Sequence, residues 1–158
     1  TVDPEMKLNI PAFIPEYYIP DISERLVLYQ RLAMIVRSCE ADELKLEIED
    51  RFGNLPGEVD ALVEVMRLRG LLRMFAVVRA ELSKAKLHIS FTAHSPLDIN
   101  KIINLVKNKE KSYSFSKSHI FSINLDNLSA GKRTVDAAFL YYAVKELLLE
   151  IGTSEIDF

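Results

Sequence analysis

Residues 47–59 read EIEDRFGNLPGEV and encode a sharp corner between two helices. Gly53 can take the positive φ of the left-handed conformation that ends many helices. Pro56 has its φ preset near the helical value and lacks an amide hydrogen, which suits the first turn of a new helix. Phe52 and Leu55 are apolar on either side of the turn, so both can pack against a core. The stretch therefore predicts a helix, a tight turn and a second helix.

The helix before this corner is acidic. We expect it to begin at a cap on Asp42, with Leu44 and Ile48 facing inward. Its ends and outer faces carry six acids, Glu40, Asp42, Glu43, Glu47, Glu49 and Asp50, against the two bases Lys45 and Arg51. Glu47 and Asp50 are three residues apart and therefore share one face. Composition alone favours a solvated surface for these acids.

An extended arm and another helix precede the acidic helix. Pro11, Pro15 and Pro20 exclude a helix over residues 7–20, and the apolar residues between them predict an arm that lies on the core. From residue 21 to about 37 the apolar residues recur at intervals of three and four. They are Ile22, Leu26, Tyr29, Ala33 and Val36, with Leu28, Leu32 and Ile35 widening the stripe. This spacing predicts a well-buried helix.

Beyond residue 75 apolar residues alternate with polar ones, which is typical of half-buried strands. The predicted strands cover residues 78–82, 87–91, 113–115 and 121–125. The first two join through a turn at Ser83 to Ala85, and the last two are also close enough in sequence to pair directly. Two antiparallel strand pairs are therefore expected.

Three more helices are expected. One runs from Pro56 to about Met74, and Ser95-Pro96-Leu97-Asp98 opens another with a hydroxyl cap at Ser95. A long apolar helix over about 132–151 can cover a sheet. The order of three helices, a strand pair, a helix, a strand pair and a long C-terminal helix predicts an α+β fold with one mainly antiparallel sheet packed on helices.

Length and composition fit one domain. With 158 residues and 49% hydrophobic side chains, the chain can bury a single core. We expect an arm or linker from a preceding domain over residues 1–20, a single domain over 21–151 and a tail over 152–158. The chain lacks an initiating Met, and we expect it to be one domain excised from a longer protein rather than a processed product.

Charge and hydropathy narrow the class of protein. The net charge of −3 disfavours a dedicated nucleic-acid binder, which is normally basic. No apolar run approaches the ~20 residues of a membrane helix. The single cysteine excludes an internal disulfide and is compatible with a reducing cytoplasm. A cytoplasmic protein without membrane contact is expected.

No nucleotide site is expected. Gly131-Lys132 resembles the end of a phosphate-binding loop, but that loop needs a glycine at position 126 and a hydroxyl at position 133. The chain has Asp126 and Arg133 there.

The histidines and the cysteine also fit no catalytic or metal pattern. His88, His94 and His119 lack the spacing of a helical metal site, and we expect them at the surface or at strand edges. Cys39 is expected to be a buried or incidental thiol rather than a nucleophile. The sequence therefore predicts no catalytic residue, no cofactor and no metal.

A basic segment around two aromatic residues indicates an alternative function. It contains Lys101, Lys107, Lys109, Lys111 and Lys117, with Glu110 as the only acid among them. Lysines beside Tyr113 and Phe115 could bind phosphates while the rings stack on bases, as in a nucleic-acid-binding module. Serine alternates with the two rings over residues 112–116, and this alternation favours rings that point into the core.

The corner is one part of a longer pattern over residues 8–69. The pattern contains IPEYYIPD at 14–21, RL at 25–26, YQRL at 29–32, DRFGNLP at 50–56 and RLR at 67–69. Together these segments resemble the C-terminal (TRCF) domain of the bacterial transcription-repair coupling factors, the Mfd family. From residue 75 onward only the order of elements is similar.

The resemblance implies a regulatory role. In this family the whole protein is a DNA translocase that removes stalled RNA polymerase and recruits UvrA through an N-terminal UvrB-like module. The C-terminal domain is non-catalytic, packs on that module, masks the UvrA-binding surface and restrains the translocase. An acidic pair before the Arg-Phe-Gly motif faces arginines of the module, which implies an interdomain interface at Glu47 and Asp50, with neighbouring Arg51. Glu49 departs from the family, whose members usually have an apolar residue there, and direct DNA contact is not expected.

Overall fold

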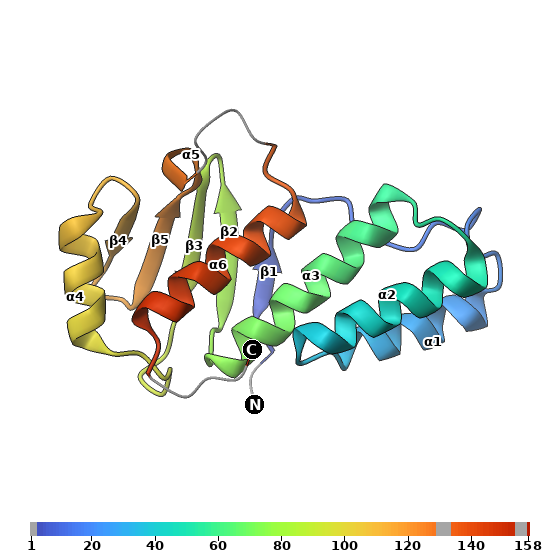
Figure 1. Cartoon of the computed structure of the whole chain (residues 1–158), viewed down its shortest axis with the longest axis horizontal. Coiled ribbons are helices and arrows are strands. Elements are labelled where there is room, and N and C mark those ends of the chain that lie inside the picture. Colours follow the sequence, from blue (N-terminus) through green and yellow to red (C-terminus); the bar gives the residue numbers. More distant parts are fainter. Residues whose placement is uncertain (1–2, 129–133, 154–157) are drawn as a thin grey trace. The chain divides into compact units, whose positions relative to one another are not determined.

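The computed structural model describes residues 3–128, 134–153 and 158, and it confirms the α+β class. Its helices are α1 (Ile22–Ala33), α2 (Ser38–Phe52), α3 (Gly57–Met74), α4 (Ile99–Asn108), α5 (Leu125–Leu128) and α6 (Ala137–Ile151). Its strands are β1 (Glu5–Lys7), β2 (Arg79–Ser83), β3 (Lys86–Ser90), β4 (Tyr113–Phe115) and β5 (Ile120–Asn124). The chain divides into two compact units, one built on the sheet and one built on α1, α2 and most of α3 (Figure 1).

The sheet has the strand order β1-β2-β3-β5-β4. The two predicted strand pairs, β2 with β3 and β4 with β5, are confirmed as antiparallel pairs, and β3 joins them by pairing antiparallel with β5. β1 pairs parallel with β2 and was not predicted. Its three residues are too few to show an alternating pattern, and in sequence they cannot be told from the extended arm.

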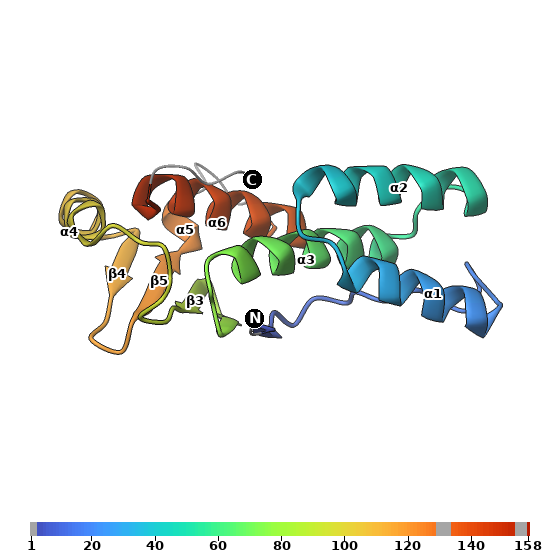
Figure 2. The same cartoon turned by 90° about the horizontal axis from the view of Figure 1, so that it is seen from below.

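The strands bury one face of the sheet and leave the other polar. Ala80, Leu87, Ile89, Phe121 and Ile123 alternate along β2, β3 and β5 and are completely buried. Residues 142–151 of α6 lie over this face (Figure 2). Burying one large apolar side chain stabilises the folded state by about 1.5–3 kcal/mol. The buried residues of this face therefore form a large part of the core of the sheet unit.

The helical unit has its own core, to which the proline-rich arm contributes. Ile14 and Ile19 of the arm are buried with Leu28, Leu44 and residues of α3. The arm is also fixed by hydrogen bonds, because the Ile14 amide donates to Tyr29 Oη at 2.7 Å and Arg25 Nη1 donates to the Ile19 carbonyl at 2.7 Å. The predicted arm lying on the core is confirmed for this segment.

The predicted buried stripe of α1 is wrong in part. Leu28, Leu32 and Ile35 are buried as expected and Tyr29 is half-buried, but Ile22, Leu26, Ala33 and Val36 are exposed. α1 also ends at Ala33 rather than near residue 37. The helix is apolar on two faces, and the spacing of apolar residues cannot tell which face meets the core.

Two predicted helix caps are also wrong. α2 begins at Ser38, where the Glu40 carboxylate accepts from the Arg37 amide at 2.8 Å, so Asp42 lies inside the helix. α4 is capped by Asp98, whose Oδ1 accepts from the Asn100 amide at 3.0 Å, and not by Ser95. In both cases the acceptor is a side chain closer to the observed first turn than the predicted cap: Glu40 in place of Asp42, and Asp98 in place of Ser95.

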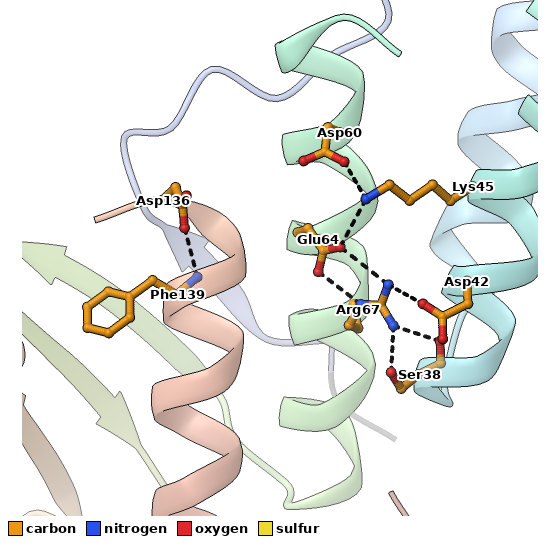
Figure 3. Close-up of polar contacts among 8 residues, drawn as sticks. All are labelled: Ser38, Asp42, Lys45, Asp60, Glu64, Arg67, Asp136 and Phe139. Carbon is orange, nitrogen blue, oxygen red and sulfur yellow. Dashed lines mark hydrogen bonds and ion pairs between the residues drawn. The ribbon is translucent and has the colours of Figure 1, made fainter. Parts of the chain in front are cut away.

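The C-terminal helix begins later than predicted. Positions 132 and 133 lie outside the described residues, and Thr134 to Asp136 are not helical. The Asp136 carboxylate accepts from the Phe139 amide at 2.8 Å and so caps α6 (Figure 3).

Candidate functional site

The corner between α2 and α3 has the predicted positive φ. Gly53 has φ 91° and ψ −172°, so its φ is as expected while its ψ is extended rather than helical. The arm fastens this corner, since Tyr18 Oη donates to the Gly53 carbonyl at 2.6 Å and its ring lies 6.1 Å from that of Phe52. Phe52 and Leu55 pack against the core as expected. The turn therefore holds the C-terminal half of α2 in a fixed position.

Glu47 lies on α2 with both carboxylate oxygens bound within the chain. Arg31 of α1 donates from Nη2 to Glu47 Oε1 at 2.7 Å and from Nη1 to Oε2. Arg51, one turn further along α2, donates to Oε2 at 3.4 Å. The hydrogen bonds from Arg31, followed by its charge and by Arg51, lower the pKa of Glu47 from 4.5 to about 2. Glu47 is therefore charged at neutral pH and already paired.

Arg51 extends this cluster back to α1. Its Nη2 lies 3.6 Å from Glu24, and its guanidinium lies 4.8 Å above the Phe52 ring. Glu24, Arg31, Glu47 and Arg51 thus form an ion-pair chain of two acids and two bases. Glu24 and Arg31 carry no sequence signal that marks them as partners of Glu47 and Arg51, although Arg31 stands in the YQRL segment of the family pattern.

Asp50 differs from Glu47 in having no ion-pair partner among the described residues. It is exposed on α2. Exposed Glu43 likewise has no ion pair within the described part, and it lines a groove of about 300 Å³. The groove lies between α1 and α2 and is lined by Arg31, Met34, Ile35, Glu40, Glu43, Leu44 and Glu47. Of the three predicted site residues, the structure joins Glu47 to Arg51 and leaves Asp50 open to solvent.

A second polar cluster, between α2 and α3, joins residues that are far apart in sequence and was not predicted. Arg67 is buried on α3 and donates to Glu64 Oε2 at 2.9 Å, to Asp42 Oδ1 at 2.7 Å and to the Ser38 carbonyl at 2.8 Å (Figure 3). Lys45 of α2 binds Asp60 and lies 3.6 Å from Glu64. These bonds turn Lys45 towards α3, so it does not neutralise the exposed acids of α2.

The basic segment does not present its aromatic rings to solvent. Tyr113 is only 6% exposed and meets Phe121 edge-on at 5.7 Å. Phe115 is half-buried and also lies 5.7 Å from Phe121. The interpretation that both rings point into the core is confirmed. The lysines around them are exposed, but the stacking surface that single-stranded nucleic acid needs is occupied.

The histidines and the cysteine form no metal site in the part of the chain that the structure describes. His88 lies on the polar face of β3 with Nδ1 2.8 Å from Ser122 Oγ, and His94 and His119 are exposed. Cys39 is exposed in the first turn of α2, so of the two alternatives, a buried or an incidental thiol, the buried one is wrong. Gly131-Lys132 lies outside the described residues. No described helix is long and apolar enough to cross a membrane.

Comparison with known proteins points to one family. A family model described as TRCF domain matches residues 8–102. The transcription-repair-coupling factor of Haemophilus influenzae is 33% identical over 122 residues, and that of Myxococcus xanthus is 32% identical over 112 residues. These alignments cover 77% and 71% of this chain, but only 11% and 9% of the two relatives. The chain is thus similar to a small part of much longer proteins.

A solved structure has the same fold. A crystal structure of the C-terminal domain of a transcription-repair coupling factor superposes with a TM-score of 0.72 over 94% of each chain. Its sequence identity of 20% supports the likeness in fold alone.

Proposed function

The chain belongs to the family of TRCF domains, and from this premise we propose that it is the C-terminal regulatory domain of a transcription-repair coupling factor. In this proposal the domain performs no catalysis and acts in the cytoplasm. It packs on the UvrB-like N-terminal module of the same polypeptide, masks UvrA binding and restrains the translocase that removes stalled RNA polymerase. UvrA and RNA polymerase are affected only through that contact.

The observation that carries this proposal is the exposed carboxylate of Asp50, which has no ion pair with any described residue. It lies three residues after Glu47, at the family position for an acid that faces arginines of the partner module. An arginine fork binds a carboxylate through two parallel hydrogen bonds, so a basic surface on the module fits this position.

We infer different roles for the two acids. Asp50 can accept a new arginine directly, whereas Glu47 already binds Arg31 and Arg51. Glu47 therefore contributes by holding Arg31 and Arg51, which keeps α1 and α2 together. Exposed ion pairs contribute about 0–1 kcal/mol each, so an interface built on them can be released.

Charge reversal at Asp50 tests this proposal. The separately purified UvrB-like module of the same protein is titrated into the chain by calorimetry. Asp50→Lys is expected to weaken binding about 10-fold, because it replaces an attraction by a repulsion. Wild-type binding should also weaken as salt rises, since the contact is exposed.

Glu110→Lys is the matched control. Glu110 is exposed in the turn after α4 and has no ion pair with a described residue, and its reversal changes the net charge by the same amount. It should bind like the wild type. Equal affinities for the wild type and Asp50→Lys would falsify the assignment of Asp50, and no binding by the wild type would contradict the regulatory contact itself.

A further inference from the structure

The polar face of the sheet carries a block of hydrogen-bonding side chains across three neighbouring strands. β3, β5 and β4 lie side by side in that order (Figure 1). Their register forms two adjacent rows, His88-Ser122-Ser114 and Lys86-Asn124-Ser112. Because successive side chains of a strand point to opposite faces, both rows lie on the face opposite buried Leu87, Phe121 and Ile123. These six residues include no acid.

The block is hollowed where it meets the turn after α4. A cavity of about 160 Å³ opens there, and we call its lining residues the β-face hollow: Lys86, Glu110, Lys111, Ser112, Tyr113, Ser114, Ser122 and Asn124. The short side chains of its three serines leave this space unfilled. One water takes up about 30 Å³ of the liquid, so the hollow has room for a group of about five non-hydrogen atoms.

The hollow has a positive charge that the chain does not neutralise. Lys86 and Lys111 are exposed, and neither has an ion pair with a described residue. Glu110 is the one acid of the lining and offsets only one of these two charges. Residues 84–117 as a whole carry seven lysines and two acids, in a chain whose net charge is −3. The local field therefore attracts anions to this part of an otherwise acidic chain.

Hydrogen bonds within the chain fix the hollow in place. The Lys111 carbonyl accepts from Asn124 Nδ2 at 3.3 Å and from Asn127 Nδ2 at 2.7 Å, which holds the backbone that bears this lysine. His88 Nδ1 lies 2.8 Å from Ser122 Oγ and positions that hydroxyl. Groups that are held before a ligand arrives lose less conformational freedom when they bind it.

We propose that the β-face hollow binds a phosphate group. Its ammonium groups supply positive charge, and its serine hydroxyls and asparagine amide supply hydrogen-bond donors. Lysine, serine and asparagine side chains are among those that contact phosphate oxygens in protein–DNA complexes. A phosphate group has three strong acceptor oxygens, against two on a carboxylate, so it can use donors from several strands at once.

The phosphate group can belong to a free phosphorylated compound or to the backbone of a nucleic-acid duplex. The bases of a nucleic acid can find no stacking partner here, because the Tyr113 and Phe115 rings pack against Phe121. A nucleic acid would therefore be held through its backbone alone, without sequence preference.

Amide chemical shifts of the ¹⁵N-labelled chain, titrated with sodium phosphate at pH 7 and constant ionic strength, test this inference. We expect saturable shifts at Ser112, Ser114 and Ser122, with half-saturation at about 1–10 mM for one small anion. Lys86→Gln and Lys111→Gln should each weaken binding by up to about 5-fold, as is usual for one exposed charge. Glu110→Gln should strengthen it about 2-fold, because it removes the carboxylate that repels the anion.

Lys84→Gln is the matched control. Lys84 is exposed in the turn between β2 and β3, does not line the hollow, and loses the same charge on substitution. It should change the affinity by less than about 2-fold, since an exposed charge outside the site is screened. The absence of saturable shifts up to about 50 mM phosphate overturns the proposal. Equal losses for Lys84→Gln and Lys86→Gln also overturn it, because they would show attraction to general positive charge rather than to a site.

A DNA duplex of about 12 base pairs, titrated in the same way, distinguishes the two sources of the phosphate. If the backbone is the source, the duplex shifts the same three serine amides, inorganic phosphate competes with it, and binding weakens as salt rises. If a free compound is the source, inorganic phosphate shifts these amides and the duplex does not. Either result, obtained together with the losses in Lys86→Gln and Lys111→Gln, supports the site.

Discussion

At the scale of the residue, the sequence could identify Glu47 but not its partners. Helical spacing placed Glu47 and Asp50 on one face, and the family pattern drew attention to both. Spacing within one helix says nothing about the neighbouring helix, so the bond from Arg31 to Glu47 could not be predicted. This bond separates two acids that look equivalent in sequence, because it pairs Glu47, whereas Asp50 has no ion pair within the described part of the chain.

The pH dependence of stability should reveal the pairing of Glu47. Its pKa is lowered from 4.5 to about 2, chiefly by the hydrogen bonds from Arg31. A lowered pKa stabilises the fold above the ordinary value, and that contribution is lost as the pH falls from 4.5 through about 2. At pH 7, Glu47→Gln should lower the free energy of unfolding by about 0.5–1 kcal/mol, as is usual for exposed pairs. The loss should shrink steadily in urea titrations at pH 4 and at pH 3.

Glu43→Gln provides the comparison for that titration. Glu43 is exposed one turn before Glu47 and has no ion pair with a described residue. Its substitution should change stability little at any pH. If the effect of Glu47→Gln at pH 3 equals its effect at pH 7, the pairing does not stabilise the fold through its charge.

At the scale of the element, the apolar period identified most helices and strands but not their faces or ends. α1 shows why, since Ile22 and Leu28 both belong to stripes of helical spacing and only tertiary contact decides that Leu28 is buried. The N-terminus of α2 also differs from the prediction because of a tertiary contact. Asp42 looks like a cap in sequence, but its carboxylate binds Arg67 of α3, 25 residues away. A buried arginine of this kind gives no local signal.

Gly70 is a position where close packing between elements can be tested. A Cβ at Gly70 would lie 2.7 Å from the Val36 carbonyl oxygen and 2.8 Å from that of Ile35, and neither backbone can yield easily. Gly70→Ala should therefore lower the free energy of unfolding by about 1–3 kcal/mol, although alanine is the better helix former. Urea denaturation followed by circular dichroism measures the difference.

Gly57 supplies the opposite case in the same helix. It is the first residue of α3, and an added Cβ would meet nothing within 4 Å. Gly57→Ala should raise stability by about 0.4–1 kcal/mol by restricting the unfolded chain. If Gly70→Ala stabilised the chain as much as Gly57→Ala, the close approach of α3 to the Ile35 and Val36 carbonyls would be wrong.

At the scale of the whole molecule, the order of elements was enough to predict the α+β class but not the complete sheet. Alternation along β2, β3 and β5 indicated strands and showed which residues are buried. The pairing of β1 with β2 joins residues more than 70 positions apart, such as Glu5 and Arg79, and three residues carry too little pattern to reveal it. The arm was predicted to lie on the core, but residues 5–7 before it instead add a mostly exposed edge strand to the sheet.

Cooperative unfolding is the expectation that belongs to this scale. The chain divides into two compact units, and the division falls inside two helices, because α3 is split after Leu71 and α6 after Tyr141. A helix gains stability by propagating along its length. If one unit unfolded alone, α3 and α6 would each have to end in their middle, and both units would lose helical hydrogen bonds. We therefore expect residues 21–151 to unfold as a single domain in one transition.

Hydrogen exchange measured by mass spectrometry along a urea series can separate the two units. Peptides from α2 report on the helical unit and peptides from β3 report on the sheet unit. The two should lose protection at the same urea concentration, and the midpoint from circular dichroism should agree with both. Two well-separated midpoints would show that the shared helices break at the division, and residues 21–151 would then be two domains. A single midpoint implies that a change made on α2, including one at the proposed interface, alters the stability of the sheet by the same free energy.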